Sequence, residues 1–234
     1  QPMPRKVDLK LPAQFTIIGK PLRRIEAASK IDGSARFGID ALPDGLLYAS
    51  VNMCPTLGGT VAHFDASRIP AKLGVIRTFV VPPYNGGTGG VAVIARDMYG
   101  ALTAAADLQP VWNAGAAAKL SSADIDARLV ETLDKDSGHA FYTVGDVDAA
   151  LQTAHRTIKA EYRAPYLAHA PVEPVNCTVQ FKDGTATVWA ATQMPTLARR
   201  HVAKVLGIDE DKVDMQVPLL GGALQDNIRQ ALGA

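Results

Sequence analysis

Cysteine is scarce in this chain, with two residues, Cys54 and Cys177, among 234. They lie far apart, and neither belongs to a Cys-x-x-Cys pair. The sequence therefore offers no thiolate set for structural zinc or for an iron–sulfur cluster. Because free cysteine usually behaves as a small hydrophobe, buried thiols are the favoured interpretation, and a disulfide between the two is left open.

Long apolar runs and an excess of charge are also lacking. No run approaches the roughly 20 apolar residues that span a bilayer. Lys and Arg number 24 against 23 Asp and Glu, and the basic residues are dispersed. This balance gives no footprint for nucleic acid or for an anionic membrane surface. The first ten residues are polar and carry prolines, unlike a signal peptide.

Metal-ligand spacing is missing as well. No two of the five histidines stand at i and i+4 beside a glutamate, so no metal held by side chains is predicted. The glycine cluster at 86–90 lacks the Lys-Ser/Thr pair of a phosphate-binding loop and runs into a strand pattern. A bare loop is favoured there, which argues against a nucleotide-binding protein.

The first half alternates short apolar runs with turn signals. After a leader at 1–19, the pattern at 20–45 predicts two short strands joined by turns at 32–33 and 43–45. Five further strands are predicted at 46–53, 58–64, 75–81, 91–95 and 109–112. Helices are predicted at 98–108 and, capped by Asp65, at 66–72. The run at 46–53 is apolar on both faces, which predicts a place inside the sheet.

The second half begins with a small-residue linker at 115–119. Helices are predicted from 121 to 133, from 145 to 151 and from 195 to 206, the last with Pro195 at its start and Gly207 at its end. Strands are predicted at 156–162, 175–181, 185–191 and 213–218. The domain boundary is expected between 115 and 140.

Two short stretches are candidate sites. His169 and Glu173 flank Pro171 on a proline-bearing ribbon, so period two places them on one face. They form either a surface pair or part of a pocket wall. Gly221 and Gly222 follow the last strand and allow backbone amides to approach an anionic group closely.

Three phrases, in this order, resemble the large subunit of the molybdenum hydroxylases, the xanthine dehydrogenase and aldehyde oxidase superfamily. The nearest likeness is to its isoquinoline 1-oxidoreductase beta-subunit branch. A similar opening phrase is carried by Lys30, Gly33, Ala35-Arg36-Phe37 and Asp40. The three phrases are His169-Ala170-Pro171-Val172-Glu173-Pro174-Val175-Asn176-Cys177-Thr178, Val188-Trp189-Ala190-Ala191-Thr192-Gln193-Met194-Pro195 and Leu219-Leu220-Gly221-Gly222.

The resemblance implies a mixed α+β fold. An α/β hammerhead domain is expected at 20–113, a linker with a short helix at 114–139, and the first part of a molybdopterin-binding domain at 140–222. The family continues with a third glycine and Phe-Gly, whereas this chain continues with Ala223. The tail at 223–234 instead spaces Leu224, Ile228 and Leu232 as a one-sided helical stripe. A truncation, a change of reading frame or an artificial junction are alternative origins.

The resemblance also implies a function. Family enzymes insert water-derived oxygen into an N-heterocycle or an aldehyde and pass electrons to a small iron–sulfur subunit. Their molybdenum is held by a pterin, near which Gly221, Gly222 and Gln193 are expected, with His169 and Glu173 lining the pocket. The catalytic glutamate of the family lies far downstream, so no catalytic residue is assigned here.

The isolated chain is therefore expected to bind no cofactor, to be inactive, and to need the C-terminal portion of the large subunit. The alternative is a non-enzymatic folded fragment or protein-binding module. The branch also implies a periplasmic location, through an export signal that this sequence does not contain. The substrate and the oligomeric state stay open.

Overall fold

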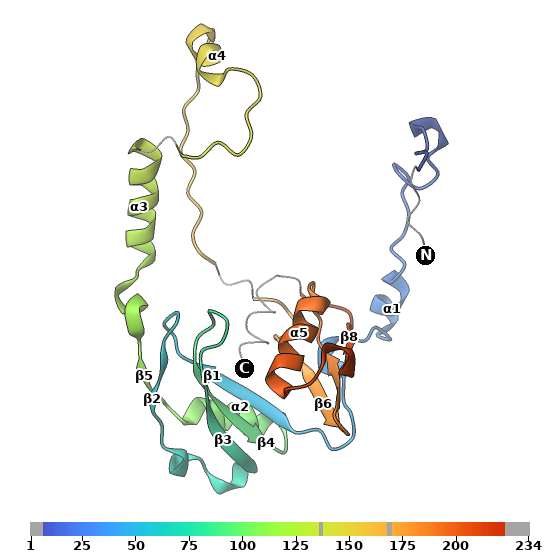
Figure 1. Ribbon diagram of the computed structural model, residues 1–234, viewed down its shortest axis with the longest axis vertical. Helices are drawn as coiled ribbons and strands as arrows, with labels where there is room; N and C mark the ends of the chain where they lie inside the picture. The colour runs from blue at the N-terminus through green and yellow to red at the C-terminus, as the bar shows by residue number, and fades with distance from the viewer. Residues whose placement is uncertain (1–6, 136–137, 168–169, 223–234) are drawn as a thin grey trace.

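The computed structural model describes residues 7–135, 138–167 and 170–222, which form two sheet-based lobes and two projecting segments (Figure 1). We call residues 46–113 the first lobe, residues 170–222 the second lobe and residues 120–167 the arm. The arm and the N-terminal segment extend away from the lobes on opposite sides of the view. The mixture of helices and sheets confirms the predicted α+β class.

The first lobe is organised around a central buried strand. The sheet has the order β1-β4-β3, built from β1 (Tyr48–Met53), β4 (Gly90–Ala95) and β3 (Val75–Val81), with both pairings antiparallel. Val91 and Val93 of β4 are fully buried. Helix α2 (Met98–Asp107) packs on β1 and β4 through alanines, whose small side chains permit a close approach. Asp97 caps α2 by accepting from the Gly100 N–H at 2.7 Å.

A second, two-stranded sheet extends the first lobe. Strand β2 (Thr60–His63) pairs antiparallel with β5 (Val111–Asn113). The 3₁₀ turns η3 (Ala66–Arg68) and η4 (Ala71–Leu73) lie between β2 and β3. Asp65 caps η3 by accepting from Ser67, as the sequence predicts.

The second lobe is a three-stranded sheet covered by one helix. Strand β6 (Thr178–Lys182) forms a hairpin with β7 (Thr185–Trp189), and β8 (Val213–Gln216) runs parallel to β7. Helix α5 (Pro195–Leu206) makes the crossover between the parallel strands. Ala203 of α5 meets Val188 and Val213 in a small core.

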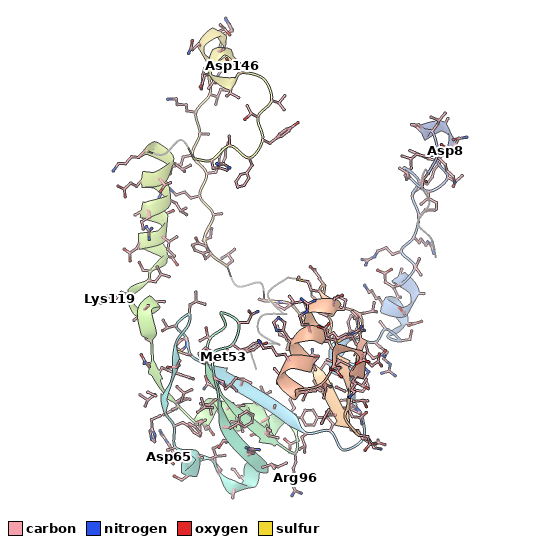
Figure 2. The ribbon with its side chains drawn as sticks, in the orientation of Figure 1. Asp8, Met53, Asp65, Arg96, Lys119 and Asp146 are labelled. Atoms are coloured by element: carbon pink, nitrogen blue, oxygen red, sulfur yellow. The ribbon has the colours of Figure 1, made fainter. Side chains whose placement is uncertain are left out.

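The projecting segments carry few contacts. The N-terminal one holds η1 (Pro12–Gln14) and α1 (Ala27–Asp32), and it ends at η2 (Gly38–Asp40), where buried Gly38 lies against the second lobe. The arm follows η5 (Gly115–Lys119) and holds α3 (Ser122–Lys135) and α4 (Val147–Thr153). Around Asp146 the side chains of the arm point into open space (Figure 2). Within the described ranges no helix is long and apolar enough to cross a membrane.

Several predicted elements are wrong. Neither of the two short strands expected at 20–45 forms: residues 27–32 are helix α1 and residues 38–40 the 3₁₀ turn η2. No strand forms at 156–162. The linker at 115–119 adopts a 3₁₀ helix, which its role as a linker leaves open. Strand β1 lies at the edge of its described sheet, where α2 covers one face. The predicted tail helix and His169 lie outside the described residues.

Candidate functional site

Glu173 joins three separate parts of the chain. Its Oε2 accepts from the Gly221 N–H at 2.7 Å, and its Oε1 accepts from the Ile39 N–H at 3.1 Å and from Asn176 Nδ2 at 3.0 Å. The Glu173 N–H in turn donates to the Gly221 carbonyl at 3.3 Å. We call these four residues the Glu173 clamp. The clamp thus fixes both the Gly-Gly turn and the segment around Ile39, which leads into the first lobe, to the extended stretch that carries Glu173.

Glycine is needed wherever this clamp closes. A Cβ on Gly221 would lie 2.5 Å from the Glu173 Cβ, and one on Gly222 would lie 2.3 Å from the Pro171 Cβ. A Cβ on Gly38 would lie 2.7 Å from Asn176 Oδ1. Such distances are far inside van der Waals contact, so any side chain would force the segments apart.

A backbone connection reinforces the clamp. Phe37 and Leu219 form a parallel bridge, and the Leu219 N–H donates to the Arg36 carbonyl at 3.1 Å. Backbone pairing thus joins the residues just before the first lobe to the residues just after β8. In this way the motif around Phe37 and the motif around Gly221 meet in space.

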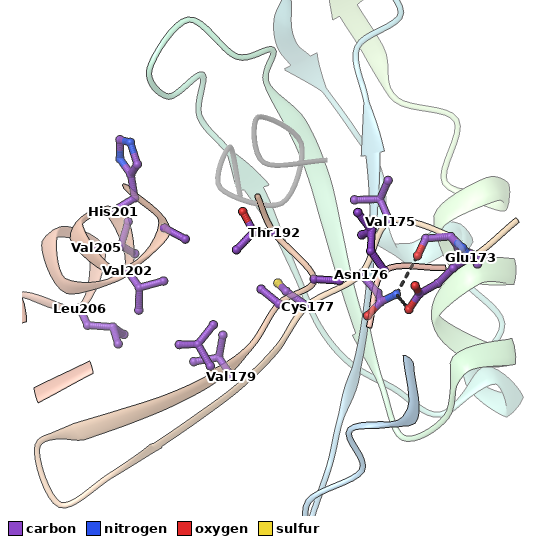
Figure 3. A pocket seen from close by; sticks show the side chains of 16 residues that line it. Glu173, Val175, Asn176, Cys177, Val179, Thr192, His201, Val202, Val205 and Leu206 are labelled. Atoms are coloured by element: carbon purple, nitrogen blue, oxygen red, sulfur yellow. Dashed lines mark hydrogen bonds between the residues drawn. The ribbon is translucent and has the colours of Figure 1, made fainter. Parts of the chain in front are cut away.

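An apolar pocket of about 210 Å³ opens beside the clamp (Figure 3). Its base includes Val188 and Ala198, each 2% exposed, and its walls come from α5 and the β6–β7 hairpin. The sulfur of Cys177 is buried, which raises the pKa of this thiol, although the residue as a whole is exposed. Its lining consists of Glu173, Pro174, Val175, Asn176, Cys177, Val179, Val188, Ala190, Ala191, Thr192, Ala198, His201, Val202, Val205, Leu206 and Leu220.

One wall of the pocket is held by a contact from the first lobe. The Tyr84 hydroxyl lies 2.9 Å from His201 Nδ1, and the two rings meet edge to face with centroids 5.5 Å apart. Lys204 lies over the Tyr84 ring at 5.6 Å from its centroid. No local sequence pattern predicts this contact, because Tyr84 and His201 are 117 positions apart.

The predicted site residues are only partly brought together. Glu173 and Gly221 are in direct contact, and Gly222 packs on Pro171. Gln193 lies exposed in the bend before α5, next to Thr192 of the pocket lining. His169 lies outside the described residues. No group of three His, Cys, Asp or Glu side chains in the described ranges is placed to hold a metal ion.

The geometry around Glu173 suits a side chain that holds the Gly-Gly turn in place rather than one that transfers a proton. The carboxylate of Glu173 is engaged by three N–H donors, which positions the turn. The Gly221 N–H already has its acceptor, and the pocket lining contains no Lys or Arg. Neither the Gly221 N–H nor this apolar pocket therefore offers a donor to an anionic pterin.

Comparison with known proteins gives a consistent result. Residues 130–224 match the family described as the molybdopterin cofactor-binding domain. The chain is 31% identical over 221 residues to a membrane-bound aldehyde dehydrogenase (pyrroloquinoline-quinone) of Gluconacetobacter polyoxogenes, covering 93% of this chain and 29% of that protein. It is 29% identical over 227 residues to the isoquinoline 1-oxidoreductase subunit beta of Brevundimonas diminuta, covering 92% and 28%.

Solved structures agree on the fold. The quinoline 2-oxidoreductase of Pseudomonas putida 86 superposes with a TM-score of 0.61 at 17% identity, covering 91% of this chain and 32% of that one. The chain thus spans less than a third of the length of the relatives it matches.

Proposed function

Because this chain is a relative of the large subunits of the molybdenum hydroxylases, as its motifs predict, we propose that it serves in a molybdenum-cofactor oxidoreductase. The whole enzyme hydroxylates an N-heterocycle or an aldehyde with oxygen derived from water. The observation that carries the proposal is the family match over residues 130–224, a range that contains Glu173, Gly221 and the pocket.

The chain contributes structure to such an enzyme. Bound molybdenum and its pterin would supply the oxygen-transfer and redox chemistry. The Glu173 clamp holds the Gly-Gly turn of the second lobe at a fixed place against the segment that leads into the first lobe. The Gly221 N–H is already used by Glu173, so donors for the cofactor have to come from other groups of the whole protein.

Partners are supported by the exposed area. The chain exposes 18224 Å². A compact protein of its 24.8 kDa would expose about 10,000 Å². Apolar side chains of the arm contribute to this excess, with Phe141 94% and Tyr162 91% exposed. We assign this surface to contacts with the rest of the large subunit and with a small iron–sulfur subunit.

The experiment begins with the whole gene product purified together with its small subunit. Molybdenum is measured by elemental analysis, and the pterin by fluorescence after oxidation. Turnover is followed with isoquinoline, xanthine and an aromatic aldehyde in the presence of an artificial electron acceptor. We expect molybdenum and substrate-dependent acceptor reduction in the whole enzyme, and neither in the 234-residue chain alone. A whole enzyme without molybdenum or turnover would favour the non-enzymatic binding module.

Location is a separate part of the proposal. The resemblance to the isoquinoline 1-oxidoreductase branch favours the periplasm. Fractionation of cells that make the whole gene product tests this, with a cytoplasmic marker enzyme as the control. An exclusively cytosolic pool would refute it.

A further inference from the structure

Residues 157–164, which we call the return segment of the arm, alternate between apolar and polar side chains. Every second residue is apolar: Ile158, Ala160, Tyr162 and Ala164. Charged residues stand between them: Lys159, Glu161 and Arg163. In an extended chain this period of two places the apolar side chains on one face and the charged ones on the other. The alternation is that of a β-strand with one packed face and one face in water.

The structure leaves the return segment without a partner strand. Within the described ranges, none of its backbone groups makes a backbone–backbone hydrogen bond, and no helix or strand is assigned to it. Its apolar face is open, with Ile158 76% and Tyr162 91% exposed. Figure 1 shows the segment as a plain trace that runs from α4 towards the second lobe, with no strand arrow beside it. Both its apolar face and its backbone are therefore available to a partner.

The polar face of the return segment already has a neighbour. Arg163 donates to Asp126 of α3 at 2.6 Å and to Glu161 at 2.5 Å. Glu161 and Arg163 are two residues apart, so their ion pair fits side chains on one face of an extended chain. Helix α3 thus meets the polar side, and the side that carries Ile158 and Tyr162 stays uncovered.

A partner that covers this apolar face must also satisfy the backbone. Covering Ile158 and Tyr162 takes the neighbouring N–H and C=O groups out of water, and buried groups of this kind need hydrogen-bond partners. A helix would not supply them, because Pro165 follows at once and the β-branched Thr157 and Ile158 favour extended geometry. The open edge of a β-sheet with an apolar face supplies both the packing and the hydrogen bonds.

We propose that the return segment adds as a strand to the edge of a sheet formed by the rest of the large subunit. The inference rests on the proposed function, because it takes the chain as one part of such a subunit. The matched part is 29% and 28% of two relatives, so more than two thirds of their length lies outside it. A sheet in the same polypeptide is favoured over a second copy or the small subunit, because a covalent connection raises the effective concentration.

Hydrogen–deuterium exchange of residues 157–164 tests the proposal on the whole gene product. We expect their amides to exchange at least about a hundredfold more slowly in the whole large subunit than in the 234-residue chain, because strand hydrogen bonds must open before exchange. The large subunit is measured with and without its small subunit, and at two protein concentrations. Exchange as fast as in the 234-residue chain would overturn the proposal. Protection that needs the small subunit, or that grows with concentration, would overturn it in favour of those partners.

Two matched variants of the whole large subunit test the alternating faces. Ile158→Ser/Tyr162→Ser removes the apolar contacts and should abolish the protection, whereas Lys159→Ser/Glu161→Ser changes the polar face and should keep it. Exchange in β4 of the same samples shows whether the first lobe is still folded, and the milder Ile158→Ala replaces the double variant if it is not. Equal protection in the two variants would count against a strand with one packed face.

The molybdenum content of the same preparations separates this proposal from the proposed function. Protection in a large subunit without molybdenum would support the strand and count against the enzyme. Molybdenum and turnover together with fast exchange would support the enzyme and overturn the strand.

Discussion

At the scale of single residues, Glu173 is the most heavily connected side chain of the site. Replacing it with alanine leaves the N–H groups of Gly221 and Ile39 without their acceptor. We expect Glu173→Ala to lower the free energy of unfolding by about 1–3 kcal/mol. Urea denaturation measures the loss. Glu173→Gln keeps one acceptor oxygen, so its free energy of unfolding should lie between those of the unaltered protein and Glu173→Ala.

Glu161→Ala is the matched control for this prediction. Glu161 is also a hydrogen-bonded carboxylate, paired with Arg163 at 2.5 Å, but both side chains are largely exposed. Exposed pairs contribute little, so we expect a change within about 0.5 kcal/mol. A similar loss in both alanine variants would show that the clamp has no special role.

Tyr84 carries a second prediction at this scale. Tyr84→Phe removes the hydroxyl that meets His201 but keeps the ring that Lys204 covers. We expect a loss of about 0.5–1.5 kcal/mol in the free energy of unfolding. A double-mutant cycle with His201→Gln separates the pairwise term, and a coupling energy near zero would contradict a direct bond.

The glycines of the site show what residues alone could and could not predict. The sequence predicts that Gly221 and Gly222 allow a close approach, and the structure provides close neighbours in Glu173 and Pro171. Their expected approach to a cofactor stays a prediction. The partners of Glu173 lie 134 and 48 residues away, so no spacing rule could have identified them.

At the scale of elements, local signals predicted those elements whose ends are set by the chain itself. Helix α5 begins at Pro195 and ends before Gly207, whose φ of 67° suits glycine. Strand β3 likewise has its predicted bounds. The strand expected at 156–162 needs a neighbouring strand to satisfy its backbone, and the described chain places none beside it.

Helix α2 gives a test in which packing opposes helix propensity. Alanine usually stabilises a helix by about 1 kcal/mol relative to glycine. At Gly100, however, a Cβ would lie 2.2 Å from the Leu73 carbonyl oxygen. We expect Gly100→Ala to destabilise the protein by about 1–3 kcal/mol. Thermal unfolding measures this, with Leu102→Ala, at an exposed position of the same helix, as a near-neutral control. A raised melting temperature for Gly100→Ala would show that the helix can move away from Leu73.

At the scale of the whole molecule, two lobes that are connected by tertiary contacts carry an arm that has little contact with them. Tyr84 and His201 join the two lobes, and the Glu173 clamp joins the second lobe to the segment just before the first. The return segment of the arm meets α3 through the Arg163–Asp126 ion pair at 2.6 Å. That pair is exposed and contributes little stability. Little within the described residues therefore holds the arm against the lobes.

Limited trypsin digestion tests this difference between lobes and arm. Residues 155–167 have no assigned helix or strand and are exposed throughout, and they include Arg156 and Lys159. Proteases act first on exposed backbone that packs weakly, so we expect early cuts at Arg156 and Lys159, together with cuts in the exposed N-terminal segment. Arg77 is the internal control, because its backbone is paired within β3. Mass spectrometry of early fragments identifies the sites.

In the assembled enzyme the same sites should be cut more slowly, because the apolar side chains of the arm would be covered. First cuts at Arg77, or equal rates with and without partners, would contradict the assignment of the arm to an interface.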